Sequence, residues 1–258
     1  MANVTTLRPG SRRLDAELVA RDLAPSRERA QALIAAGLVE VDGARAGSAA
    51  HRVGTASAVR VLGRDHPWAS RGGVKLSAAL DAFDVACAGR VALDAGASTG
   101  GFTDVLLARG VARVYAVDVG RGLLLSRLAR DPKVVVMDET NARHLRSLPG
   151  PAPSLITLDV SFISLRLVLP AMARLSARPA DVIALFKPQF ELGRDAVGRG
   201  GLVRDEALTR QSLDGFLAWA REELGAEAPR PPVPAALRGS KGNQEWMAHL
   251  VLPHEGSA

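Results

Sequence analysis

The feature of the sequence that most constrains the fold is a regular alternation between short apolar runs and segments of helical character. The apolar runs are rich in Val, Leu, Ile and Ala and occur at 91–94, 114–118, 134–138, 155–159 and 182–187. Such an alternation is typical of a parallel sheet with helices packed on its faces. Downstream, apolar periodicity predicts a long amphipathic helix at 205–224 and a closing strand at 246–252. This part of the chain therefore predicts an α/β fold with a Rossmann-like sheet.

The first 62 residues follow another pattern. Their apolar spacing predicts two short helices and two short strands, with a hairpin turn at Asp42-Gly43, and the four elements are expected at 12–22, 26–36, 38–41 and 58–62. This part contains nine Arg and six acidic residues, which is +3 of the chain's net charge of +6. The excess of positive charge indicates a polyanionic partner, although a solvated basic face would have the same composition.

Three features of this segment resemble the small RNA-binding domain first found in the ribosomal protein S-four: the motif Arg13-Leu14-Asp15, the helix at 26–34 and the hairpin at Gly43. The resemblance implies a small α+β domain that binds RNA. Residues 1–62 contain no Phe, Tyr or Trp, so this domain cannot stack bases as an RRM does, and we expect it to contact phosphates of helical RNA. The expected RNA-binding residues are Arg12, Arg13, Arg27 and Arg29, with Arg71 further along the chain.

The stretch at 63–67 has the composition of a linker. We therefore expect an RNA-binding domain at 1–62, an interdomain linker at 63–74 and a second, larger domain at 75–258.

Several classes of protein are disfavoured by what the sequence lacks. No run approaches the roughly 18 to 20 apolar residues of a membrane span, and the N-terminus has no signal-peptide pattern, so we expect a cytoplasmic protein without a membrane partner. Cys87 is the single cysteine, and the five histidines lack ligand spacing, which predicts neither a disulfide framework nor a metal site. Nothing in the sequence indicates an obligate protein partner.

A glycine-rich segment, Asp94 to Asp104, directly follows the first predicted strand of the sheet. A turn of this kind lets the backbone approach a ligand closely at a helix N-terminus. The next strand ends in Asp118, where a carboxylate can accept hydrogen bonds from both hydroxyls of a ribose. The segment lacks the G-x-G-x-x-G pattern of dinucleotide folds and opens with an acid, which favours the cationic cofactor S-adenosylmethionine. The expected cofactor-binding residues are Asp94, Gly96, Ser98, Thr99, Gly100, Gly101, Phe102, Asp118 and Asp138.

Two charged residues stand at the ends of later predicted strands, Asp159 and Lys187. The active site of an open α/β sheet lies at the carboxyl ends of its strands, so both are candidates for catalysis. A lysine at the end of an apolar strand is costly unless its charge is used, and we expect Lys187 to face the site.

A larger set of motifs resembles the TlyA family, the hemolysin-A-type ribosomal RNA 2′-O-methyltransferases. The matching segments are 70–76, 93–104, 159–165, 186–191 and 241–245. The resemblance implies an FtsJ/RrmJ-like catalytic domain with a Lys-Asp-Lys-Glu tetrad, whose matching residues are Lys75, Asp159, Lys187 and Glu245. It also implies S-adenosylmethionine as the methyl donor and ribosomal RNA, within ribosomal subunits, as the partner, with a cytidine ribose of 16S or 23S rRNA as the expected acceptor.

The expected roles of the tetrad follow from the chemistry of a ribose hydroxyl, which is a poor nucleophile. Its proton must leave as the oxygen attacks the methyl group in line with the departing sulfur. We expect Lys187 to act as the general base or to steer the hydroxyl, and Lys75 to be a second cation that contacts phosphate. Asp159 and Glu245 are expected to orient the lysines, although Glu245 could instead pair with Lys241 on the surface.

Three other functions remain as alternatives. A non-catalytic RNA-binding assembly factor with a methyltransferase fold is disfavoured by the complete tetrad. A membrane-acting hemolysin is disfavoured because the sequence has no long basic amphipathic helix with aromatic anchors. Methylation of a base amine is disfavoured because Asp159-Val160-Ser161-Phe162 stands where amine-directed enzymes have Asn/Asp-Pro-Pro-Tyr/Phe.

Overall fold

The computed structural model describes residues 11–21, 23–24, 26–35, 37–62 and 66–254. The chain forms two compact units, residues 1–67 and 68–258, and each has its own hydrophobic core. Residues 63–65 of the predicted linker, and residues 22 and 36 at the ends of the two predicted N-terminal helices, lie outside the described residues.

The first unit is a small α+β structure. Leu14, Leu18, Leu33 and Val39 are among the residues of its core. Strand β2 pairs antiparallel with β3 and β5, and β1 pairs with β4. The elements are β1 (Arg12–Arg13), α1 (Leu14–Ala20), α2 (Arg27–Ala35), β2 (Val39–Val41), β3 (Ala44–Arg45), β4 (Arg52–Val53) and β5 (Val59–Val61).

One expectation for this unit is wrong at its start. Arg12 and Arg13 form strand β1 and are not the first turn of a helix. The reason is a competing partner for the backbone: Arg12 and Arg13 pair with Val53 and Arg52, and the amide of Leu14 donates to the carbonyl of His51 at 2.7 Å. Helix α1 therefore begins only at Leu14.

The second unit is built on a seven-stranded sheet with the order β11-β12-β10-β9-β6-β7-β8. Strands β10, β9, β6, β7 and β8 are parallel, whereas β12 is antiparallel to β10, and β11 to β12. This confirms the predicted α/β fold with a Rossmann-like sheet. The strands are β6 (Val91–Ala95), β7 (Arg113–Val117), β8 (Val134–Met137), β9 (Leu155–Leu158), β10 (Ala180–Phe186), β11 (Val233–Pro234) and β12 (Trp246–Leu252).

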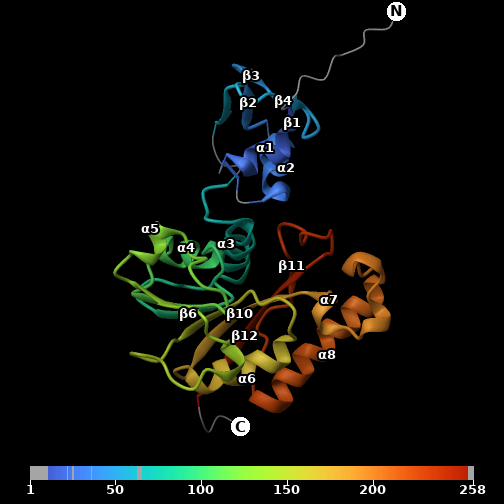
Figure 1. The fold of residues 1–258 in the computed structure, drawn as a ribbon. Helices are drawn as coiled ribbons and strands as arrows, with labels where there is room; N and C mark the ends of the chain where they lie inside the picture. Colours follow the sequence, from blue (N-terminus) through green and yellow to red (C-terminus); the bar gives the residue numbers. More distant parts are fainter. Residues whose placement is uncertain (1–10, 22, 25, 36, 63–65, 255–258) are drawn as a thin grey trace, which may run out of the picture. The chain divides into compact units, whose positions relative to one another are not determined.

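Helices cover both faces of this sheet (Figure 1). On one face α6 and α8 pack against inward side chains such as Leu93 and Phe186, and on the other α3 and α4 pack against Ala92 and Leu185. The helices of this unit are α3 (Arg71–Phe83), α4 (Gly101–Ala108), α5 (Ser126–Ala129), α6 (Leu165–Leu175), α7 (Pro188–Glu191) and α8 (Glu206–Leu224), with short 3-10 turns at Ala142–His144, Arg194–Ala196 and Arg199–Gly201. Among the described residues, no helix is both long and apolar enough to cross a membrane.

Helix α3 begins inside the segment 63–74 that we expected to be a linker. Ser70 is its N-cap, and the Ser70 hydroxyl accepts a hydrogen bond from the amide of Gly72 at 3.3 Å. Gly73 packs so closely on Trp68 that a side chain would collide with the indole. Residues 68–74 therefore pack with the second unit. The division into domains at 1–62 and 75–258 remains a prediction.

Candidate active site

The loop after β6 approaches two neighbouring segments too closely for side chains at two of its glycines. Gly96 has a φ of +85°, and a Cβ there would lie 2.5 Å from the carbonyl oxygen of Asp159. A Cβ on Gly101 would collide with the hydroxyl of Ser70. The loop is thus clamped between the end of β9 and the start of α3. Thr99 lies in the same turn, whereas Phe102 lies in the first turn of α4 and is buried beneath α3.

Two acids at the ends of the next two strands hold backbone amides near this loop. Asp118 follows β7 and accepts hydrogen bonds from the amides of Ser98 at 2.8 Å and Gly120 at 2.7 Å, one on each carboxylate oxygen. Asp138 follows β8 and accepts from the amide of Gly122 at 2.8 Å. Both carboxylates remain partly exposed. Gly96, Asp118 and Asp138 therefore stand at consecutive strand ends of one sheet edge.

Asp94 lies differently from what the sequence indicated. Its carboxylate is fully buried and accepts hydrogen bonds from the hydroxyls of Thr103 on α4, at 2.7 Å, and of Thr157 on β9, at 3.0 Å. Burial in this setting raises the pKa of Asp94 to about 7. With no exposed surface, Asp94 ties the glycine loop to the next strand of the sheet, and we propose this supporting role in place of the direct cofactor contact expected above.

Lys187 and Asp159 form an ion pair at the carboxyl ends of β10 and β9. Lys187 Nζ lies 2.7 Å from Asp159 Oδ1 and donates to Ser161 Oγ at 3.0 Å. Lys187 is only 8% exposed. The charge of Lys187 is therefore compensated by Asp159 and Ser161, as expected for a lysine at the end of a buried strand.

Lys75 and Glu245 form a second buried ion pair, with Nζ and Oε2 2.5 Å apart. Lys75 lies on the second turn of α3, and Glu245 directly precedes β12. Glu245 is 3% exposed and is paired with Lys75, not with Lys241. The surface pairing that the sequence left open is thus absent from the structure.

The two ion pairs lie at the same edge of the sheet. Phe186 and Trp246 are register partners in the antiparallel β10–β12 ladder, so Lys187 and Glu245 follow and precede paired residues. Gly72 in the first turn of α3 lies beside Asp159, since a Cβ there would be 3.3 Å from Oδ2. The structure therefore brings together all four residues of the expected tetrad, next to the glycine loop.

An exposed aromatic side chain stands beside these ion pairs. Phe162 is 86% exposed and has a φ of +63°, a left-handed conformation that a bulky side chain rarely adopts. Its ring lies 5.1 Å from that of Phe190 on α7, measured between centroids. Strained backbone of this kind is found preferentially at functional sites.

Glu191 fixes the segment that carries Phe162. It accepts hydrogen bonds from the hydroxyl of Ser164 at 2.6 Å and from the amide of Leu165 at 2.7 Å, at the start of α6. Burial raises the pKa of this carboxyl. The sequence interpretation assigned no role to Glu191, Ser161 or Phe162, because the motif shows their presence but not the conformation that places them.

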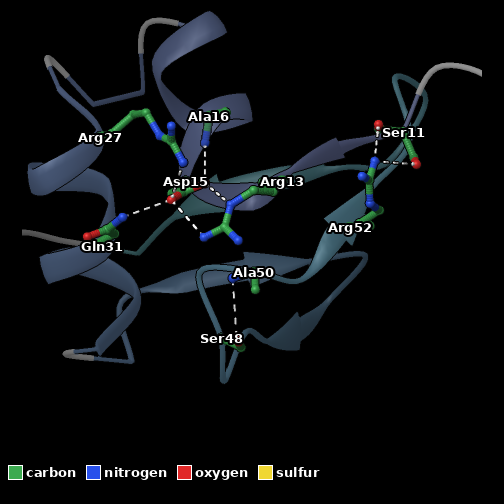
Figure 2. A network of polar contacts seen from close by, with 9 residues as sticks. All are labelled: Ser11, Arg13, Asp15, Ala16, Arg27, Gln31, Ser48, Ala50 and Arg52. Carbon is green, nitrogen blue, oxygen red and sulfur yellow. Dashed lines mark hydrogen bonds and ion pairs between the residues drawn. The ribbon is translucent and has the colours of Figure 1, made fainter.

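The arginines expected to bind RNA contact groups of the protein itself, and two of them share one acceptor. Arg13 and Arg27 donate to Asp15, as Figure 2 shows, and Arg12 lies 3.6 Å from Glu17. Arg29 is half-buried on α2, and Arg71 on α3 donates to the carbonyl of Arg238 at 3.3 Å. Arg71 thus belongs to the unit that carries the tetrad, whereas the other four lie in the first unit.

The comparison with protein families agrees with this architecture. Residues 68–250 match the FtsJ-like methyltransferase family, and residues 12–59 match the S4 domain. The chain therefore consists of an S4 domain followed by an FtsJ-like methyltransferase domain.

Individual relatives show which methyltransferase family this is. A Mycobacterium tuberculosis protein, the 16S/23S rRNA (cytidine-2'-O)-methyltransferase TlyA, is 48% identical over 92% of this chain and 89% of its own length. Hemolysin A of Brachyspira hyodysenteriae is 35% identical over 93% of this chain and its entire own length. A solved structure from Streptococcus thermophilus, which carries the name of a hemolysin, superposes with a TM-score of 0.77 at 35% identity, covering 96% of this chain and 90% of that one. The chain belongs to the TlyA family of methyltransferases.

Proposed function

We propose that this protein transfers the methyl group of S-adenosylmethionine to a ribose 2′-hydroxyl of ribosomal RNA, on a cytidine of 16S or 23S rRNA or of both. The observation that carries the proposal is the Lys187–Asp159 ion pair, which lies beside the Lys75–Glu245 pair and the glycine loop. The M. tuberculosis relative, named for this reaction, supports the choice of substrate. A ribosomal substrate also supports a cytoplasmic location.

The residues at the sheet edge fit the proposed cofactor. The backbone at Gly96 leaves no room for a side chain, as expected where a loop lies against a ligand and a neighbouring strand end. Asp118 already accepts one backbone amide on each carboxylate oxygen, and each oxygen keeps a second lone pair for a ribose hydroxyl. We propose that residues 96–101 and Asp118 hold the cofactor, with Asp138 toward the adenine. S-adenosylmethionine supplies a methyl group activated by a sulfonium.

The four tetrad residues have distinct roles in the proposal. Lys187 Nζ contacts the 2′-hydroxyl and acts as its general base or steers it as the oxygen attacks the methyl group. Asp159 and Ser161 hold Nζ in place through the contacts described above. Lys75, oriented by Glu245, offers a second cation to a phosphate next to the reacting ribose.

Phe162 and Phe190 support the RNA side of the proposal. A ribose inside a helix is presented to an enzyme more easily when its nucleotide leaves the stack, and an exposed ring gives the displaced base a surface to stack on. Phe162 is the exposed ring nearest in sequence to the ion pair of Asp159. We propose that the base of the target nucleotide stacks on Phe162.

The test is methyl transfer from labelled S-adenosylmethionine to purified 30S and 50S ribosomal subunits. Lys187→Ala is compared with Lys133→Ala, which removes an exposed lysine before β8. The proposal requires label to enter at least one subunit, with the rate reduced at least 100-fold by Lys187→Ala and unchanged by Lys133→Ala. Binding of the subunits without any transfer of label would instead support an assembly factor.

A further inference from the structure

Asp15 is a fully buried carboxylate that three side chains of the first unit share. Arg13 donates to it through both Nε and Nη2, each at 3.1 Å, while Arg27 Nη2 donates at 3.0 Å and Gln31 Nε2 at 2.8 Å. Figure 2 shows Asp15 between Arg13 from β1 and Arg27 from α2. One anion therefore fixes two guanidinium groups that come from different elements.

The charges of this cluster do not cancel. One carboxylate is balanced against two arginines, which leaves an excess of one positive charge. The hydrogen bonds from Arg13 and the other partners hold the pKa of Asp15 well below its usual range, so the carboxylate is ionised at neutral pH. The side chains of Arg13 and Arg27 remain 44% and 57% exposed. Both guanidiniums are thus oriented from the inside and open to solvent on the outside.

A second buried acid in the same helix shows the contrast. Glu17 pairs with Arg21 at 2.8 Å, but Arg21 also donates to the carbonyl oxygens of Gly54, Thr55 and Ser57. Its donors thus serve to tie α1 to the loop before β5. Among the described residues, Arg13 and Arg27 have no side-chain hydrogen bond other than those to Asp15. The arginines held by Asp15 therefore keep donors for a ligand.

The neighbouring strand adds positive charge. Arg52 on β4 is the register partner of Arg13 on β1, and like charges directly opposite each other in a ladder are unfavourable. Arg52 turns to the carbonyl of Ser11, to which it donates at 2.9 Å, whereas Arg13 turns to Asp15. Arg52 is thus a further exposed cation on the same short ladder, and no acid among the described residues forms an ion pair with it.

We infer that Asp15 is a positioning residue, which holds Arg13 and Arg27 as a preformed binding site for a phosphate of the RNA. This inference rests on the proposed function and extends it. A planar guanidinium binds phosphate through paired hydrogen bonds, and an arginine loses much rotamer freedom when it does so. Side chains that are already fixed lose less on binding, which increases affinity. Asp15 itself need not touch the RNA.

The direction in which RNA affinity changes when the charge of Asp15 is removed distinguishes a positioning role from simple electrostatics. Removal of a negative charge beside a phosphate site strengthens RNA binding if charge alone matters. Removal of the residue that fixes two arginines weakens it if position matters. Asp15→Asn is therefore compared with Glu17→Gln, which also neutralises a buried acid of α1, although Glu17 additionally lies 3.6 Å from Arg12. Both variants are used as the full-length protein.

The experiment measures equilibrium binding to 16S and 23S rRNA without cofactor, below the unfolding temperature of each variant. We expect Asp15→Asn to bind roughly tenfold more weakly, about the loss of one charge-assisted hydrogen bond, and Glu17→Gln to bind within about twofold of the wild type. Equal or tighter binding by Asp15→Asn would overturn the inference. So would equal weakening by the two variants.

A second variant covers the case in which Asp15→Asn does not fold. Arg13→Lys keeps the charge, but a lysine cannot form the paired contact to Asp15. We expect it to bind about fivefold more weakly, and wild-type affinity would contradict the inference. Since no methyl donor is present, these results stand apart from the proposed reaction: a wild-type protein that binds RNA through this site but transfers no methyl group would refute the reaction alone.

Discussion

Nζ of Lys75 lies 2.5 Å from Oε2 of Glu245, although 170 positions of sequence separate the two residues. The contact joins α3, at the start of the second unit, to the residue that precedes its last strand. Both partners are buried, so the pair holds α3 against the start of β12 at the sheet edge where the proposed active site lies.

Loss of one partner of this pair is expected to destabilise the fold strongly. Glu245→Ala leaves a buried lysine without its counter-charge, which costs roughly 3 to 5 kcal/mol. The double substitution Lys75→Met with Glu245→Leu removes both charges and should recover most of that loss. Urea unfolding measures the stabilities. Methyl transfer should be lost in both variants, and a double variant with wild-type activity would contradict the role of the pair.

Gly96 tests the cofactor loop. Gly96→Ala places a methyl group against the carbonyl of Asp159 at a φ of +85°, so we expect a loss of stability of about 3 kcal/mol and no binding of S-adenosylmethionine. Gly89→Ala is the matched control, since Gly89 also has a positive φ, of +74°, but open space around it. It should cost only about 1 kcal/mol and bind the cofactor normally. Binding is measured by calorimetric titration with S-adenosylmethionine. Wild-type affinity of the Gly96→Ala variant for this cofactor would argue against the proposed site.

The buried Asp94 makes a pH dependence predictable. Its folded pKa is about 7, whereas a carboxyl in the unfolded chain titrates near about 3.9. Below about pH 4 the group is protonated in both states, and the burial of Asp94 then has no pH-dependent cost to stability. Between about pH 4 and 7 the unfolded chain releases the proton first, so stability falls as the pH rises, by at most about 1.4 kcal/mol per unit. Above pH 7 the loss is constant.

The measurement is the difference in unfolding free energy between the wild type and Asp94→Asn, taken from pH 4.5 to pH 8. The other titrating groups cancel in this difference. We expect Asp94→Asn to gain relative stability up to about pH 7 and then to stay level. A difference that does not change with pH would show that Asp94 titrates normally.

Phe162 tests the proposed stacking of the target base. Phe162→Ala removes an exposed side chain and should change stability by less than about 0.5 kcal/mol. Because stacking of one base is worth about 1 to 3 kcal/mol, KM for ribosomal RNA should rise at least fivefold. Phe162→Trp keeps an aromatic surface and should retain the wild-type KM. An unchanged KM for the Ala variant would exclude a stacking role.

Much of the fold could be predicted from the sequence because strands buried on both faces must be apolar along their length. Strand β12 was predicted with its observed limits, and α8 within one residue of them. The strand-end positions of Asp159 and Lys187 followed from the same pattern. Elements of two residues, such as β1 and β4, contain too few side chains for any periodicity to show.

What the sequence could not show is the direction of individual side chains. Asp94 and Asp118 both end a predicted strand, yet the first is buried between two threonines and the second faces the loop. The same holds for Asp15, whose contact with Arg27 spans twelve positions of sequence. Pairing of Glu245 with Lys75 and not with the nearby Lys241 is likewise a result of tertiary packing.

The most direct test of the central claim is the chemical position of the transferred methyl group. Ribosomal RNA labelled by the wild-type protein is digested with alkali, which cleaves a phosphodiester bond only where the preceding 2′-hydroxyl is free. Our account predicts that the label remains in an alkali-resistant dinucleotide whose first residue is cytidine. Label released with mononucleotides would place the methyl group on a base and would contradict ribose 2′-O-methylation.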